Sequence, residues 1–349
     1  VWIMAYTDID KPSDYFNTVL YTGNGNSGHA ISGLDFQPDF VWTKRRDSSS
    51  GHHVHNSISG ATKYIFPNDD AAESTDANKL SSFNSDGFTV GTNGDANTDG
   101  GTFVAWNWKA GTSFTNDASA TGIGTIDSTG SVNTDAGFSI ISYTGNASAS
   151  QSVAHGLGVA PKIVLVKPRN QAYQWLFQTT QIDGSYDYLY LNQTDAKANL
   201  SVSAPTSTVF NLSNSDAFNG SGDSLIAYCF AEKKGYSKFG SYTGNGSTNG
   251  SYIHLGFKPA FFLIKNTNDG TDDWHIMDNK RNGYNPQNNI LQPNLNDAEG
   301  SSTRVDFLSN GVKINSSSAF INGSGETIIY MAFAEQPFVT STGVPATAR

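Results

Sequence analysis

The chain has one cysteine, little charge and no long hydrophobic run, and each shortage excludes a class of protein. Cys229 is the only cysteine among 349 residues, so no internal disulfide can form. Its apolar neighbours in Leu225–Ala231 predict a buried, inert thiol in a fold assembled in a reducing cytoplasm. No apolar stretch approaches the roughly 20 residues of a membrane-spanning helix, and no signal peptide is visible. We therefore expect no membrane insertion.

Charged residues make up only 15% of the chain, and the net charge is −10 with a pI of about 5.0. An acidic surface repels nucleic-acid phosphates, and the longest basic cluster, Lys44–Arg46, is followed at once by Asp47. We expect no nucleic-acid partner. Disorder is also disfavoured, because disordered chains combine low hydrophobicity with high charge, and here 12% of the residues are aromatic.

Signatures of catalysis are missing as well. There is no Gly-x-Ser-x-Gly elbow, no His-Glu-x-x-His and no Gly-rich phosphate loop ahead of a helix. A pair of aspartates could serve a glycan-cleaving enzyme, but no spacing singles one out. The sequence predicts a protein that is not an enzyme, with no catalytic residue and no cofactor.

What the chain does contain is a repeat, and the three copies share four landmarks in the same order. The copies open with Tyr21-Thr-Gly-Asn-Gly25, Tyr143-Thr-Gly-Asn-Ala147 and Tyr242-Thr-Gly-Asn-Gly246. A proline follows 17 or 18 residues later and precedes an apolar strand ending in lysine, namely Phe40–Lys44, Ile163–Lys167 and Phe261–Lys265. An aromatic position comes next, at Trp175 and Trp274, and we place His53 at the corresponding position of the first copy. Each copy closes with a Gly-led apolar run, Gly100–Trp108, Gly222–Phe230 and Gly325–Phe333.

These landmarks divide the chain into repeat units and connecting segments. The predicted repeats are residues 17–110, 138–234 and 235–338. Residues 111–137 are dominated by Gly, Ser, Thr, Ala and Asp and are predicted to be an extended linker or arm, whereas units 2 and 3 should be closely apposed. Met4–Asp8 resembles the closing run Met331–Glu335, so residues 1–16 are predicted to be a connector led by the closing strand of an upstream or neighbouring unit. Residues 339–349 form a C-terminal tail.

Local patterns within each unit predict an all-β fold. The apolar runs are four to eight residues long, rich in Val, Ile, Phe, Tyr and Thr, and bounded by Gly, Asn and Asp. Asp86-Gly87 and Asn310-Gly311 are typical of tight hairpin turns. The strands after the prolines and the closing strands are continuously apolar, so we expect them to be central. Many short strands in each unit predict tandem β-sandwiches, and a jelly-roll arrangement is the alternative.

Two clusters could bind metal. His53 and His55 would point to the same face of a strand and could hold zinc or nickel, although we expect them to fill space in the fold. Asp95, Asn97 and Asp99 match the first half of a calcium loop, but Trp106 stands where the bidentate glutamate belongs. A polar turn is the alternative, and these three residues remain the metal candidates.

Aromatic residues suggest a glycan-binding surface. Tyr186, Tyr188 and Tyr190 alternate along one predicted strand, and Trp106 and Trp108 alternate along another. Aromatic faces can stack on sugar rings, while neighbouring Asn and Asp side chains can hydrogen-bond to hydroxyls. The alternative is that these stripes face the core.

The motifs together resemble a known family. They are the three Tyr-Thr-Gly-Asn openings, Pro205–Phe210, Ala227–Glu232, Gly235–Asn245 and Tyr330–Glu335. In this combination the chain resembles a family of repeat-containing structural proteins, labelled tail-fibre-like, of tailed bacteriophages of marine bacteria. The similarity covers nearly the whole chain, and the family offers no catalytic motif to carry over.

The resemblance implies a bacteriophage virion protein on the particle surface, assembled in the bacterial host cytoplasm. A tail fibre or other host-attachment appendage is the leading interpretation, with a capsid decoration protein and a glycan-cleaving tailspike as alternatives. The expected partners are other copies of the chain, in a homotrimer by analogy with phage fibres, other virion proteins and a host surface glycan.

Overall fold

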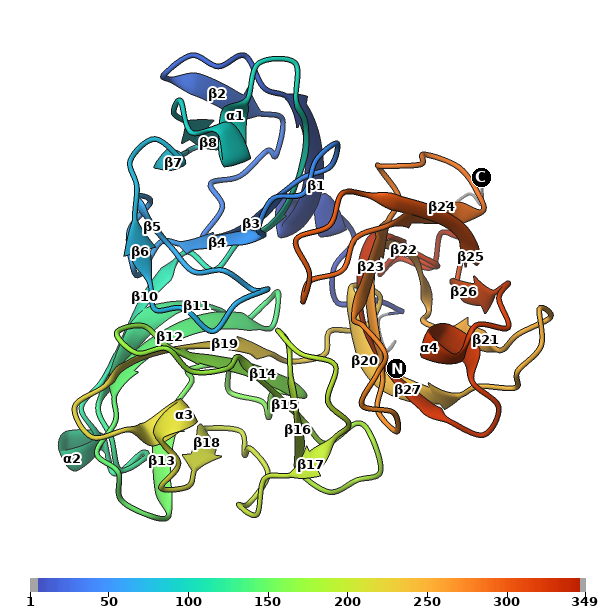
Figure 1. Cartoon of the computed structure of the whole chain (residues 1–349). Helices are drawn as coiled ribbons and strands as arrows, with labels where there is room; N and C mark the ends of the chain where they lie inside the picture. The colour runs from blue at the N-terminus through green and yellow to red at the C-terminus, as the bar shows by residue number, and fades with distance from the viewer. Residues whose placement is uncertain (1–5, 346–349) are drawn as a thin grey trace.

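The computed structural model describes residues 6–345, in which nearly all regular structure is β. Three β-sandwich units follow one another along the chain and surround a common centre (Figure 1). Among these residues, no helix has the length and hydrophobicity needed to cross a membrane. The predicted all-β, sandwich-type fold is confirmed.

Unit 1 follows a short helical turn, η1 (Pro12–Asp14), and contains nine strands and one helical turn. These are β1 (Phe16–Thr22), β2 (His29–Ser32), β3 (Phe40–Arg45), β4 (His53–Asn56), β5 (Lys63–Tyr64), β6 (Ser74–Thr75), β7 (Leu80–Asn84), β8 (Gly87–Val90), α1 (Gly94–Asn97) and β9 (Thr102–Trp108). The inner sheet has the order β1-β9-β3-β4, and the outer sheet has the order β2-β8-β7.

Unit 2 repeats this plan and adds strands at both edges of its inner sheet, whose order is β10-β11-β12-β19-β14-β15-β16-β17. The first half contains β10 (Thr112–Asn116), α2 (Ala118–Thr121), β11 (Ser128–Asn133), β12 (Phe138–Thr144), β13 (Gln151–Ala154) and β14 (Ile163–Pro168). The second half contains β15 (Leu176–Thr179), β16 (Asp187–Tyr190), β17 (Ala198–Asn199), β18 (Val209–Leu212), α3 (Asp216–Asn219) and β19 (Ser224–Phe230). Strands β13 and β18 pair as its outer sheet.

Unit 3 has an inner sheet of order β20-β27-β22-β23 and an outer sheet of order β21-β26-β25-β24. Its elements are β20 (Ser237–Thr243), β21 (Tyr252–His254), β22 (Phe257–Asn266), β23 (His275–Asp278), β24 (Gln287–Ile290), β25 (Gly300–Leu308), β26 (Gly311–Ile314), α4 (Ala319–Asn322) and β27 (Thr327–Pro337). In every unit the closing strand lies between the first strand and the strand after the proline, which confirms that these apolar strands are central. The predicted hairpins β7–β8 and β25–β26 are also confirmed.

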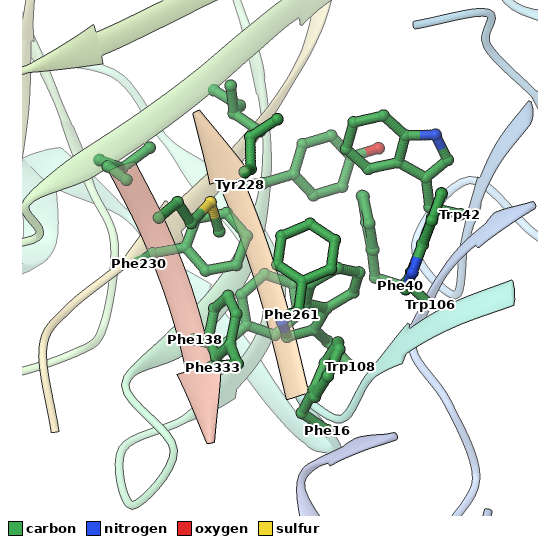
Figure 2. Close-up of a cluster of buried hydrophobic side chains, with 14 of the residues drawn as sticks. Phe16, Phe40, Trp42, Trp106, Trp108, Phe138, Tyr228, Phe230, Phe261 and Phe333 are labelled. Atoms are coloured by element: carbon green, nitrogen blue, oxygen red, sulfur yellow. The ribbon is translucent and has the colours of Figure 1, made fainter. Parts of the chain in front are cut away.

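The three inner sheets share one hydrophobic core. Each unit has its own core between its two sheets, but a fourth cluster draws buried side chains from all three units. At its centre Phe16 of unit 1 stacks on Phe333 of unit 3 at 5.3 Å between ring centroids, and Phe40 meets Tyr228 of unit 2 at 4.7 Å (Figure 2). Because burial of apolar area is the main stabilising term in folding, no unit can leave this arrangement without exposing aromatic surface.

Residues 111–137 do not form the extended linker that their composition predicts. Strand β10 pairs with β11, and β11 pairs with the edge of β12, so the segment widens the inner sheet of unit 2. One of its glycines is required by close backbone approach, because a Cβ on Gly130 would lie 1.9 Å from the carbonyl oxygen of Ile140. Composition alone cannot separate a flexible arm from a strand whose contacts are made by the backbone.

The two terminal segments of the described residues lie beside unit 3 (Figure 1). The closing strand proposed for Met4–Asp8 falls largely on residues 1–5, outside the described residues, and Tyr6–Asp8 form no strand. Asp8 donates its backbone N–H to the carbonyl of Lys234 at 2.9 Å. In the tail, the backbone N–H of Ser341 donates to the carboxylate of Asp10 at 2.6 Å, which joins the two terminal segments.

Candidate functional site

The Tyr-Thr-Gly-Asn motif is structural, because its side chains hold a buried asparagine at the end of a helical turn. The Tyr21 hydroxyl donates to the carbonyl of Ala96 at 2.9 Å, and the Asn97 amide oxygen accepts from the Asn24 N–H at 2.9 Å. A side chain at Gly23 would clash, since a Cβ there would lie 2.1 Å from a neighbouring carbonyl oxygen. The same pairs recur as Tyr143 with Phe218, Asn146 with Asn219, Tyr242 with Ile321 and Asn245 with Asn322.

The lysine that ends each strand after the proline is fully buried and crosses to another unit. Each ammonium group donates to three carbonyl oxygens, two in its own turn and one in a loop of the neighbouring unit. The three sets are Lys44 with Arg45, Ser48 and Asn296; Lys167 with Pro168, Gln171 and Asp70; and Lys265 with Asn266, Asp269 and Thr194. Burial lowers the pKa of each lysine to about 8. Three acceptors match the three donors of an ammonium group, so each lysine ties two units together.

These bonds run in one direction around the molecule. The loop at residues 66–73 of unit 1 reaches unit 2, the loop at 190–197 of unit 2 reaches unit 3, and the loop at 292–299 of unit 3 returns to unit 1. Identical head-to-tail contacts close a ring when the rotation between subunits allows it. The single chain therefore builds within itself the arrangement of a cyclic trimer.

Equivalent indole groups bond to backbone carbonyls across two of the three interfaces. Trp175 of unit 2 donates to the carbonyl of Phe66 in unit 1 at 2.8 Å, and Trp274 of unit 3 donates to the carbonyl of Tyr190 in unit 2 at 2.9 Å. These tryptophans precede β15 and β23 by one residue. In unit 1 the residue one place before the corresponding strand, β4, is His52 and not the His53 that the sequence alignment selected.

His52, not His53, is the counterpart of the two tryptophans. The ladders pair Thr43 with His53, Val166 with Leu176 and Ile264 with His275, so His53 is equivalent to residues one place after the tryptophans. A shift of one residue moves a side chain to the other face of a strand. The His52 ring indeed takes the role of the indole, with Nε2 3.1 Å from the carbonyl oxygen of Gln292 in unit 3.

Arg–Glu pairs cross two of the three interfaces. At the third interface, among the residues that the structure describes, the equivalent position has a backbone hydrogen bond but no such pair. Arg169 forms a two-pronged bond with Glu73 across the unit 1–unit 2 interface, with both distances 2.8 Å. Arg46 does the same with Glu299 across the unit 3–unit 1 interface, at 3.0 and 2.8 Å. The backbone bond that accompanies each pair recurs between Lys197 and Thr267 at the unit 2–unit 3 interface. There Lys197 pairs instead with Asp183 and Asp187 of its own unit.

The histidine candidates lie in a buried polar cluster inside unit 1. His53 Nε2 lies 2.6 Å from Nζ of Lys79, which also pairs with Asp95 at 3.1 Å and lies 4.9 Å from the ring centre of Tyr64. Burial, followed by the nearby Lys79 charge, holds the pKa of His53 well below its usual value. His55 turns to the carbonyl of Ala61, so the two histidines do not converge on a common point.

Two of the three calcium candidates, Asp95 and Asn97, already bond to other groups of the protein. The Asn97 amide is buried and bonds to backbone groups, and the Asp95 carboxylate accepts from Lys79 and Ser50. Asp99 is exposed. Within residues 6–345, no three His, Cys, Asp or Glu side chains form a group that could hold a metal ion.

The aromatic stripes face the interior. Trp106 and Trp108 are fully buried in the central core (Figure 2). The Trp106 indole donates to Asp278 of unit 3 at 3.0 Å. Tyr186 is buried in the core of unit 2, while Tyr188 and Tyr190 are half-buried against it. These five residues therefore do not form the exposed glycan surface that the sequence suggested. The prediction for Cys229 is confirmed, since it is buried and burial raises its pKa to about 12.

The sequence did contain a signal for the interface lysines, because a lysine recurs at the end of three apolar strands. A charged residue in that position indicates a buried group that needs several acceptors. The acceptors could not be found from the sequence, since they are backbone carbonyls in loops of unrelated composition.

Comparison with known proteins identifies one family for this chain. No curated protein and no solved structure matches the chain. One family, described as a domain of unknown function (DUF7483), matches residues 11–337, which span all three units without a break. The chain therefore belongs to the DUF7483 family.

Proposed function

We propose that this protein is a non-enzymatic structural module on the surface of a bacteriophage virion, in a tail fibre or related host-attachment appendage. The observation that supports this proposal best is the closed ring of three sandwiches around a common core. The buried lysines that the three repeats share serve to hold that ring together. A module of this kind suits display and mechanical endurance rather than turnover.

The ring of three units within one chain bears on the predicted homotrimer. Phage fibres obtain threefold symmetry from three chains, whereas this chain has three equivalent units of its own. The proposal therefore does not require three copies. A single copy can sit on the axis of a threefold-symmetric partner and present one unit to each of its subunits.

The test is the position of this chain in intact particles, determined by cryo-electron microscopy with a labelled antibody against unit 3. Density at the tail tip or baseplate is the expected result. Density spread over the head lattice would overturn the attachment role and favour a decoration protein. Release of reducing ends from host polysaccharide by the purified chain would overturn the non-enzymatic assignment.

A further inference from the structure

Unit 3 exposes aromatic side chains on its outer sheet. Tyr252 on β21 is 45% exposed, and its ring centroid lies 6.4 Å from that of His254, which is also exposed. The Tyr252 hydroxyl donates to the Asn310 side chain at 2.6 Å, so the exposed ring is anchored at one end. An anchored, solvent-facing ring needs an explanation beyond packing.

The other two units show that the fold does not require these rings. Gly87 and Gly311 are equivalent, because a Cβ at either would lie about 2 Å from a carbonyl oxygen, that of Ile31 or Ile253. The strand registers then align His254 with Ser32 and Tyr252 with Ala30. In unit 2 the same positions are Ala154 and Ser152. Units 1 and 2 fold with small residues at both positions, so the aromatic pair is a feature of unit 3 alone.

A groove of about 500 Å³ has both His254 and Tyr6, a second exposed tyrosine, in its lining. This volume lies within the range typical of small-molecule sites. The groove is lined by the terminal segment, the start of β20 and the end of β21, namely Tyr6, Asp8, Glu232, Lys234, Lys238 and His254. The rings of Tyr6 and His254 therefore line the groove, and Tyr252 stands beside it in ring contact with His254.

The polar lining is balanced in charge. Two carboxylates, Asp8 and Glu232, are matched by the ammonium groups of Lys234 and Lys238. Lys238 is held in place by a bond to the carbonyl of His254 at 2.7 Å, and Glu232 accepts the N–H of Phe239 at 3.1 Å. Donors and acceptors without a net charge favour a neutral, hydroxyl-rich ligand over an ion.

We infer that this groove binds a neutral oligosaccharide. A sugar ring presents an apolar C–H face and a rim of hydroxyls, which match a tyrosine ring and the balanced polar lining respectively. A protein partner would call instead for a continuous apolar patch at the centre of the contact. The inference rests on the proposed attachment role and assigns the receptor contact to unit 3.

The test is binding of the purified full chain to a defined panel of glucose, galactose and mannose tetrasaccharides, followed by saturation-transfer NMR and calorimetry. We expect at least one to bind, with saturation transfer strongest at ring protons. Tyr252→Ala should weaken binding at least tenfold, whereas Tyr252→Phe, which keeps the ring, should stay within threefold. Tyr284→Ala is the matched control, because Tyr284 is 73% exposed in the same unit but, unlike Tyr252, makes no ring contact with a residue that lines the groove.

Three outcomes would overturn the inference: no member of the panel binds, Tyr252→Ala binds as the unaltered chain does, or Tyr284→Ala weakens binding equally. Thermal unfolding of each variant separates lost binding from lost structure. A chain found at the tail that binds no sugar would overturn this inference and leave the proposed function standing. A chain that binds sugar but lies on the head would overturn the attachment role alone.

Discussion

The unit 1–unit 2 and unit 2–unit 3 interfaces use the same frame but differ in charge. Both have a buried lysine bonded to a neighbouring carbonyl and an indole bonded to another. Only the first adds the Arg169–Glu73 pair. Backbone carbonyls that accept from a buried lysine are present at every interface, whereas, among the residues described, an Arg–Glu pair is not. The comparison therefore indicates that these neutral acceptors fix the geometry of the ring. The ion pairs are additions to a frame that already closes.

The unit 3–unit 1 interface differs in another way, because an imidazole replaces the indole. His52 Nδ1 accepts from the Trp42 indole at 3.0 Å, so Nε2 carries the proton that it donates to Gln292. Both nitrogens are committed in the neutral ring. A further proton would sit on Nδ1 and oppose the Trp42 N–H, so protonation of His52 should weaken this interface.

The largest effect should come from breaking the shared frame. Lys167→Met keeps the length of the side chain but leaves three carbonyl oxygens, one of them in a buried bond and two in part-buried bonds, without their donor. Each unsatisfied group costs about 1–3 kcal/mol, so we expect a loss of about 4 kcal/mol in the free energy of unfolding, measured in urea. Lys265→Met should cost a similar amount at the interface without an ion pair.

Lys63→Met is the surface control, because the hydrogen bond of the Lys63 side chain to Thr75 is exposed. It should change the free energy of unfolding by less than about 0.5 kcal/mol. If the Lys167 and Lys265 variants were as stable as this control, the shared frame would not be what holds the units together.

A smaller effect is expected when the charged interface is made to resemble the neutral one. Arg169→Thr copies the residue at position 267, but it leaves Glu73, whose side chain is 7% exposed, without its partner. We expect a loss of about 3 kcal/mol, typical of an uncompensated buried charge. The double variant Arg169→Thr/Glu73→Gln should recover part of that loss in chemical unfolding. A double variant less stable than the single one would contradict this account.

Acid should act on the interface that contains the imidazole. Burial holds the pKa of His52 well below its usual value near 6.5, so the unfolded chain takes up this proton at a higher pH than the folded chain does. Stability is therefore complete above about pH 6.5 and falls as the pH is lowered, by up to about 1.4 kcal/mol per pH unit for this histidine.

His52→Gln removes the titrating group and should reduce the stability difference between pH 7 and pH 5 by about 2 kcal/mol. His254→Gln, at an exposed position, is the control. Unfolding in urea at the two pH values gives the comparison. An unchanged pH dependence in the His52 variant would show that other groups govern acid sensitivity.

The smallest effect should come from removing one indole bond. Trp274→Phe leaves the carbonyl of Tyr190 without its donor and should cost about 1 kcal/mol, as should Trp175→Phe for the carbonyl of Phe66. Amide exchange measured by mass spectrometry should rise more in the loop at residues 190–197 than at 66–73, because the latter keeps its ion pair. Equal increases would mean that the Arg169–Glu73 ion pair does not protect the loop at residues 66–73 from exchange.

The sequence was sufficient for the units, because their evidence is local. The apolar runs, the Asp86-Gly87 and Asn310-Gly311 turns and the single buried cysteine follow from short-range patterns that the structure confirms. It was insufficient for residues 111–137 and for His52. A strand built on backbone contacts has the composition of a linker, and a one-residue shift in alignment changes the face on which a side chain lies.

The sequence alone therefore determined three sandwich units, their central strands and the absence of disulfides, since propensity and hydrophobic periodicity act within a few residues. Only the tertiary structure decided that the units close into a ring around one core. Tryptophans that alternate along a strand have the same pattern whether they face a sugar or another sheet. The acceptors of the buried lysines are backbone carbonyls, which every residue has, so only folding could select them.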